Sequence, residues 1–291
     1  MTSALWLAAG SALCFGLALV SARAGLLGRG VRAGAAISVP TATAMLLLVA
    51  PFAVDWSAFD ARAALLFAVV GLFFPAVVTL LGFRSTVEVG PTVTGAIAGT
   101  SPLFALAAAA LWLGESVPAH AAWGSLGVGL GVAALSWQPG TRPRDFALRA
   151  LGWAVLAAAV RGGSQALVRG GLTWWPEPVA AATIGYVMSS LVLLSAHHLS
   201  TRDLASSAPP GRRRWMVLTG LLNGAGVLFM YGALVRAPVA LVAPVVASYP
   251  LVTATVAMLV PGGERPNVMR LAGVALIVAA VVLVLRAPPG A

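Results

Sequence analysis

Long apolar stretches follow one another along the whole chain, separated by short connections. Each is close to the length of about 20 residues that an α-helix needs to cross the hydrocarbon core of a bilayer. A spanning segment must satisfy its own backbone hydrogen bonds, and a continuous apolar stretch does so as a helix. The sequence therefore predicts an all-α integral membrane protein with ten transmembrane helices. The ten stretches are residues 3–21, 33–54, 62–83, 89–112, 118–137, 149–169, 178–198, 214–235, 238–260 and 267–286.

The composition excludes an ordinary soluble protein. Hydrophobic residues make up 60% of the chain and charged residues only 9%, whereas soluble domains carry roughly 25% charged residues. No connection is long enough for a separate soluble domain, and the longest, around residues 199–213, is polar and rich in arginine. We therefore expect a multi-pass protein of the cell membrane.

The chain is strongly basic, and its positive charge comes from arginine alone. The formal net charge is +10, and all 18 basic residues are arginines. Because they lie mostly at the ends of the apolar stretches, we expect them to contact membrane lipids with anionic headgroups, and we expect no nucleic acid partner. Cys14 is the only cysteine, which excludes a disulfide or a thiolate metal site within the chain. We expect no cofactor and no metal, and either a monomer or a homodimer.

The arginines are unevenly divided between the two ends of the expected helices. Twelve belong to the connections after the first, fifth, seventh and ninth stretches, and four lie at the opposite ends. Arginine-rich connections face the cytoplasm in most membrane proteins. This count places both termini outside the cytoplasm.

The chain contains an internal repeat. The segment "SPLFALAAAALWLGE" ends at Glu115, and the segment "YPLVTATVAMLVPGGE" ends at Glu264. Each has Pro-Leu near its start, at Pro102 and Pro250, and each is followed by a glycine nine residues after the glutamate. The residues before the two prolines align without gaps, so the fourth and ninth stretches occupy equivalent positions.

The repeat divides the chain into two domains of five helices, residues 1–143 and residues 144–291. A weaker match supports this division, since residues 15–23 align with residues 161–169. Because five is an odd number of crossings, the second half must be inverted relative to the first. Inverted repeats of this kind are typical of secondary transporters, whose substrate site lies between the two halves.

The second half also resembles a known family. The run "YGALVRAPVALVAPVVASYPLVTATVAML", followed by a glutamate and "LAGVALIVAAVVLVL", is similar to the EamA module of the drug/metabolite transporter superfamily. The resemblance covers nearly the whole chain as two tandem EamA modules. It implies ten helices around a central cavity and substrates such as amino acids, nucleosides, drugs and other metabolites. It also implies that both termini are cytoplasmic, which is the opposite of what the arginine count indicates.

Arg161 is the charged residue that the apolar pattern explains least. It lies about twelve residues into the sixth stretch, which at ~1.5 Å per residue places it near the middle of the membrane. An arginine facing lipid at that depth would be very unfavourable, so we expect Arg161 to face the interior of the bundle. Gln165 lies one turn later on the same face. A substrate carboxylate or phosphate would suit this arginine, and the alternative is a structural arginine bonded to free carbonyls at a proline kink.

Several other side chains are candidates for the same substrate site. Arg84 lies at the end of the third stretch, where the alternative is an ion pair with Glu88 one turn away. The aromatic and polar candidates are Phe83, Tyr186, Asn223, Tyr231, Ser248 and Tyr249, of which Phe83 and Tyr231 occupy matching positions of the repeat.

Prolines inside the apolar stretches predict kinks in the helices. We expect Pro102, Pro244 and Pro250 to shape the packing of the bundle, or to act as hinges. Glu115 and Glu264 end the fourth and ninth helices, where we expect capping or hydrogen bonding between helices. Gly127 and Gly131 form a small-xxx-small face that predicts close helix packing.

These features favour a secondary transporter that works by alternating access, and we expect an exporter of a small amino acid-like, zwitterionic or anionic metabolite. A membrane-embedded enzyme is one alternative, but the apolar stretches contain almost no acids and no nucleophile–base pair. A passive channel or scaffold is another. Within the superfamily, the small multidrug transporters exchange protons at a glutamate in the first helix, and the first helix here has no acid.

Overall fold

The computed structural model describes residues 2–26, 31–89, 91–137, 148–198, 210–259 and 267–286, and every secondary-structure element within these residues is a helix. The elements in chain order are α1 (Thr2–Leu26), α2 (Val31–Ala53), η1 (Trp56–Ala58), α3 (Ala61–Phe73), α4 (Ala76–Val89), α5 (Pro91–Ala98), α6 (Ser101–Ala108), η2 (Ala109–Leu113), α7 (Ala119–Ser136), α8 (Leu148–Trp174), α9 (Pro178–His198), α10 (Pro210–Arg236), α11 (Val239–Val246), α12 (Tyr249–Leu259) and α13 (Val268–Arg286).

These elements build ten membrane crossings. Nine segments of the described chain are long and apolar enough to span a bilayer. The tenth crossing is α7, whose 18 residues also include His120. Three crossings are interrupted: α3 and α4 form one, α5, α6 and η2 form another, and α11 and α12 form a third. The prediction of an all-α membrane protein with ten spans is confirmed.

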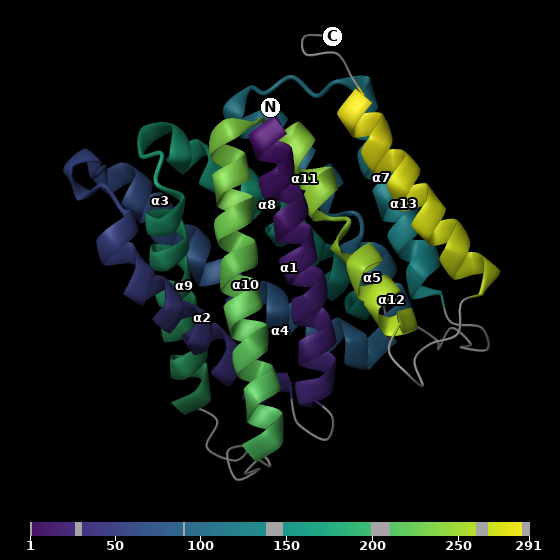
Figure 1. Ribbon diagram of the computed structural model, residues 1–291, viewed down its shortest axis with the longest axis horizontal. Coiled ribbons are helices and arrows are strands. Elements are labelled where there is room, and N and C mark those ends of the chain that lie inside the picture. The colour runs from purple at the N-terminus through teal and green to yellow at the C-terminus, as the bar shows by residue number, and fades with distance from the viewer. Residues whose placement is uncertain are drawn as a thin grey trace.

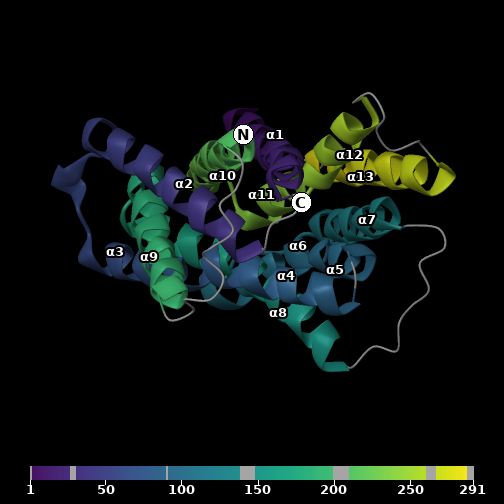
Figure 2. The same ribbon diagram turned by 90° about the horizontal axis from the view of Figure 1, so that it is seen from below.

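The two halves of the chain make equivalent contacts. The helix α1 packs against α10, and its counterpart α8 packs against α3 and α4. In the same way, α2 packs against α10, and α9 packs against α3. The pairs α2–α9 and α7–α13 each join one helix of the first half to its equivalent in the second. In Figures 1 and 2, α3 and α9 lie at one end of the bundle's long axis, and α7 and α13 lie at the other.

The second half is inverted relative to the first. In Figure 1, α1 begins at the upper end of the bundle and runs downward, whereas α8 runs upward. As a result α1 begins, and α13 ends, at the same end of the bundle. We call this the terminal end. At the opposite end lie the described arginines Arg23, Arg213, Arg214 and Arg270, and we call it the arginine-rich end. The predicted domain boundary at residues 143 and 144 lies outside the described residues.

Two of the interrupted crossings, the one formed by α5 and α6 and the one formed by α11 and α12, are broken in the same way at equivalent positions. We call them the two broken helices. The Thr100 hydroxyl donates to the carbonyl of Ile97 at 2.6 Å, and the Ser248 hydroxyl donates to that of Val245 at 2.7 Å. After each break the chain resumes a helix with a proline in its first turn, where a missing N–H costs nothing. Proline also disfavours helical geometry in the residue before it, so a helix that meets a proline stops just before it.

The prolines Pro102 and Pro250 therefore begin new helical segments, and Pro244 lies inside α11 as a buried residue. The third interruption follows the same principle, since α3 ends at Phe73 and α4 begins immediately after Pro75. A sequence-based expectation of kinks is thus replaced by full breaks at two of the three prolines that we singled out.

Glycines allow α7 and α13 to approach each other closely. A Cβ atom at Gly131 would lie 2.5 Å from a side-chain carbon of Ile277 and 2.9 Å from the carbonyl oxygen of Gly273. A Cβ atom at Gly127 would lie 2.7 Å from the Cβ of Ala280. The predicted small-xxx-small face is confirmed, and it joins the last helix of one half to the last helix of the other.

Candidate functional site

A cavity of about 300 Å³ lies between the two halves of the bundle. Its wall includes residues within two turns of the arginine-rich ends of α1, α2 and α10, such as Ala22, Gly34 and Met216. The cavity therefore occupies the half of the bundle nearer the arginine-rich end. The side chains that the arguments below use are those of Phe15, Phe74, Arg161, Tyr186, Asn223 and Tyr249.

Arg161 lines this cavity from the middle of α8. Its guanidinium carbon lies 5.8 Å from the centre of the Phe74 ring, a distance at which a cation is attracted to the ring face. It makes no hydrogen bond or ion pair with any residue that the structure describes. The prediction that Arg161 faces the interior of the bundle is confirmed, and the structural alternative, an arginine held by carbonyls at a proline kink, finds no support among these residues.

Gln165 lines a smaller inner pocket of about 20 Å³, which shares Arg161, Phe15, Phe74 and Tyr249 with the main cavity. This volume has room for about one water molecule. The side-chain oxygen of Gln165 is buried and has no hydrogen-bond partner among the described residues. An unsatisfied buried polar group of this kind costs about 1–3 kcal/mol. The inner pocket thus holds unused hydrogen-bonding capacity next to an unpaired positive charge.

The two broken helices meet at the inner pocket. Ser101, the first residue of α6, lines it from one half. Val246, Ala247 and Tyr249, which surround the break between α11 and α12, line it from the other. Interrupted helices at the interface of inverted repeats form the substrate sites of several transporter folds. The inner pocket is therefore the point where both repeats converge.

The other predicted site residues fall into two groups. Asn223, Tyr249 and Tyr186 line the main cavity, and Tyr186 is close enough to Arg161 to interact with it electrostatically. Tyr231 is buried in the core and is absent from the cavity wall, although it lies near Tyr186. Ser248 is absent from the walls of both pockets as well, and its hydroxyl bonds within its own helix break.

Arg84 lies outside the cavity as well. Its side chain is 53% exposed and bonds Glu88 at 2.9 Å, and its guanidinium carbon lies 4.7 Å from the centre of the Trp153 ring. The structure therefore shows the ion pair that was the alternative for this residue. The side chain of its neighbour Phe83 lies outside the part of the chain that the structure describes.

Small hydroxyl side chains of the wall were not singled out from the sequence. Ser38, Thr79, Thr94 and Thr219 all line the main cavity. The Thr219 hydroxyl bonds the carbonyl of Trp215 on its own helix at 2.8 Å, as hydroxyls do in many membrane helices. Such residues carry no sequence signal that distinguishes a cavity wall from a helix contact.

Among the described residues of the main cavity's wall, one carries a formal charge, Arg161. The described residues that form it include no aspartate, glutamate, histidine or cysteine. Within the described chain, no group of three such residues could hold a metal ion. A ligand of this cavity therefore meets a single positive charge surrounded by aromatic rings, amides and hydroxyls.

The fold and the cavity define a class of protein, the polytopic membrane transporters built from inverted repeats. A family model for the EamA-like transporter family matches residues 148–286. The match covers the second half of the chain, and the first half repeats its element order and its helix break. Residues 148–286 therefore belong to the EamA-like transporter family, within the drug/metabolite transporters. The protein is thus a transporter and a multi-pass protein of the cell membrane.

A solved crystal structure supports the fold along the whole chain. It superposes with a TM-score of 0.80 at 18% sequence identity, over 98% of this chain and 98% of that chain. At this identity the likeness concerns the fold alone. A comparison with curated proteins finds no match.

Proposed function

We propose that this transporter moves a small anionic or zwitterionic metabolite, such as an amino acid-like molecule, by alternating access. The observation that carries the proposal is the guanidinium of Arg161, which has no hydrogen-bond partner among the described residues and is the single charge that they bring to the wall of the cavity. A guanidinium binds a carboxylate or phosphate through two parallel hydrogen bonds. Gln165 and the break between α11 and α12 would bind further polar groups of the same molecule in the inner pocket.

The size of the cavity suits a small metabolite. Its volume of about 300 Å³ is at the lower end of the ~300–1,000 Å³ range of small-molecule sites. The aromatic rings of Phe15, Phe74 and Tyr249 around Arg161 would contact the apolar part of a zwitterion. A multiply charged ligand would bind less well, because among the described residues of the wall only Arg161 is charged, and a bulky ligand would exceed the volume of the cavity.

The direction of transport depends on which end is cytoplasmic, and the arginine count, unlike the family resemblance, supports export. The positive-inside rule would place the arginine-rich end in the cytoplasm, and the cavity lies in that half of the bundle. A substrate would then load from the cytoplasm and leave at the terminal end. A passive channel is disfavoured because the terminal half is tightly packed in the described residues: Leu234, Val239 and Trp175 have no exposed surface.

Transport by the purified protein in liposomes tests this proposal. Radiolabelled neutral amino acids, a dicarboxylate, inorganic phosphate and a cationic amine should be loaded separately, and exchange of each should be followed. We expect exchange of at least one carboxylate or phosphate compound, and none of the amine. Exchange of the amine alone would contradict the proposed substrate class, and downhill leakage of every compound would indicate a channel.

A further inference from the structure

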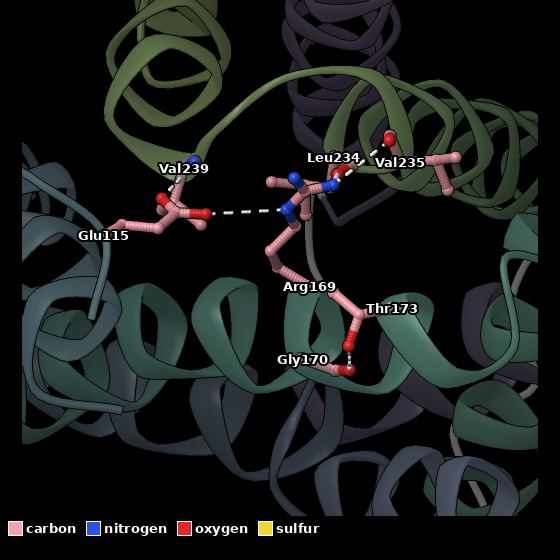
Figure 3. A network of polar contacts seen from close by, with 7 residues as sticks. All are labelled: Glu115, Arg169, Gly170, Thr173, Leu234, Val235 and Val239. Carbon is pink, nitrogen blue, oxygen red and sulfur yellow. Dashed lines mark hydrogen bonds and ion pairs between the residues drawn. The ribbon is translucent and has the colours of Figure 1, made fainter. Parts of the chain in front are cut away.

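A second polar cluster lies around Arg169 of α8, beyond the inner pocket and near the terminal end of the bundle. Figure 3 shows its contacts. The carboxylate of Glu115 accepts from Arg169 Nε at 3.4 Å and from the backbone N–H of Val239 at 2.9 Å. Arg169 Nη1 donates to the carbonyl of Val235 at 3.1 Å and also to that of Leu234. We refer to these five residues as the Glu115 cluster.

The Glu115 cluster joins the two repeats. Glu115 follows η2, at the end of the broken helix of the first half, and the other four residues belong to the second half. Arg169 satisfies carbonyls of the last turn of α10, and Glu115 satisfies the first N–H of α11, groups that a helix leaves without internal partners. The prediction that Glu115 would cap or bond a neighbouring helix is confirmed. Its role reaches further, because two helix ends depend on one ion pair.

The ion pair is sheltered from solvent. The side chains of Arg169 and Glu115 are 22% and 16% exposed, whereas those of the Arg84–Glu88 pair are 53% and 35% exposed. A sheltered pair with additional hydrogen bonds is screened less by water and salt than a surface pair, whose contribution is about 0–1 kcal/mol. The Glu115 cluster can therefore hold α8, α10 and α11 together at this end.

The cluster also lies in line with the cavity. Arg161, Gln165 and Arg169 follow one another at intervals of four residues, which places them on nearly one face of α8 with a rise of ~6 Å per step. Arg161 lines the main cavity, Gln165 lines the inner pocket, and Arg169 belongs to the cluster. The helix α11 makes a second connection, since it begins at Val239 in the cluster and ends at the break that lines the inner pocket.

We propose that the Glu115 cluster is the closed gate of the transport path, and that this path follows the Arg161–Gln165–Arg169 face of α8. The proposal rests on the alternating access proposed above. With the gate closed, a substrate enters the cavity from the arginine-rich end and reaches the inner pocket. Separation of Glu115 from Arg169 frees the end of α10 and the start of α11, and opens the inner pocket toward the terminal end.

Accessibility of a single cysteine in the inner pocket tests the gate without any substrate. Ser101→Cys, in a Cys14→Ser background, places a thiol of similar size to the native hydroxyl in that pocket. A membrane-impermeant thiol reagent is applied at the terminal end of the protein in sealed vesicles, and Ser116→Cys, exposed at that end, verifies which face is reached. We expect slow labelling of Cys at position 101 with the gate intact, and about tenfold faster labelling after Glu115→Gln, which removes the charge that holds Arg169.

A matched control and a second variant sharpen the result. Glu88→Gln removes the exposed ion pair with Arg84 and should leave the labelling rate unchanged. Arg169→Lys keeps the positive charge but loses the planar set of guanidinium N–H donors. It should therefore give an intermediate rise in the labelling rate, even if Glu115→Gln does not fold. Unchanged labelling from the terminal end in every folded gate variant would overturn the proposal. Because the assay needs no ligand, this result is independent of whether the proposed substrate class is correct.

Discussion

Arg161 and Arg169 lie two turns apart on nearly one face of α8, and their surroundings are opposite. Arg169 is held by a carboxylate and by carbonyls at the end of a neighbouring helix. Arg161 lies over an aromatic ring, with its guanidinium carbon 5.8 Å from the ring centre, and bonds no residue that the structure describes. The same side chain is thus bonded to a carboxylate and carbonyls at one level of the bundle and available at another. We interpret the first as part of a closure and the second as part of a binding site.

A reversible cross-link across the cluster should stop transport. Glu115→Cys combined with Arg169→Cys, in a Cys14→Ser background, can be bridged by a bifunctional methanethiosulfonate. The bridge replaces a breakable ion pair by a covalent one, so we expect exchange in liposomes to cease and to return after reduction. The control carries Arg84→Cys and Glu88→Cys, and its transport should not respond to the same reagent. Full transport by the bridged protein would show that this end need not open there.

Gln165→Met should weaken substrate binding without lowering the stability of the protein. Methionine has nearly the same volume as glutamine and removes the buried oxygen that has no partner in the described structure. We expect the melting temperature in detergent to stay the same or to rise, by the equivalent of about 1 kcal/mol. Exchange of the substrate should weaken at the same time, because the inner pocket loses its amide. A strongly destabilised Gln165→Met would mean that the amide is satisfied in the native protein.

The arginine-rich ends should be reached from one side of the membrane. Single cysteines at Arg213 and Met269 lie at that end, and single cysteines at Ser57 and Ser116 lie at the terminal end. In a Cys14→Ser background, an impermeant reagent added outside intact cells should label the second pair and spare the first. Labelling of one member of each pair would contradict the topology, and labelling of the first pair alone would reverse its direction and the case for export.

Gly131→Ala should destabilise the contact between α7 and α13. The added Cβ would lie 2.5 Å from Ile277 and 2.9 Å from a backbone oxygen, and such overpacking costs about 1–3 kcal/mol. The matched control is Gly152→Ala on α8, where no atom lies within 4 Å of the new Cβ. We expect a lower melting temperature and less monodisperse protein for the first variant alone. Equal stability of the two would show that the helices separate without cost.

The sequence predicts much of this fold because lipid restricts the possible structures. Stretches of about 20 apolar residues must be helices, and an odd number of them per repeat requires inversion. The interior position of Arg161 followed from the cost of exposing it to lipid. The positions of Arg84 and Tyr231 did not follow, because the sequence does not reveal which face of a helix meets a cavity.

The helix breaks and the Glu115 cluster required the structure. Pro102 and Pro250 indicated interruptions, but a kink and a complete break leave the same pattern in an apolar sequence. Arg169 lies near a helix end, where an arginine normally contacts water or headgroups. Its contact with Glu115 depends on packing between residues 54 positions apart, which no local pattern reports. Hydroxyls such as Thr219 were missed because they are common throughout membrane helices.

Exchange by Arg161→Gln in proteoliposomes tests the central claim most directly. The substitution removes the charge and keeps most of the side-chain length, and Arg62→Gln, at the exposed start of α3, is the matched control. We expect Arg161→Gln to remain folded and monodisperse, since its guanidinium has no partner in the described structure. Its exchange of an anionic or zwitterionic substrate should fall by at least about 30-fold, as expected for loss of ~2 kcal/mol, while Arg62→Gln exchanges normally. Exchange at the parental rate, or a variant that no longer folds, would show that Arg161 is structural and would contradict the account.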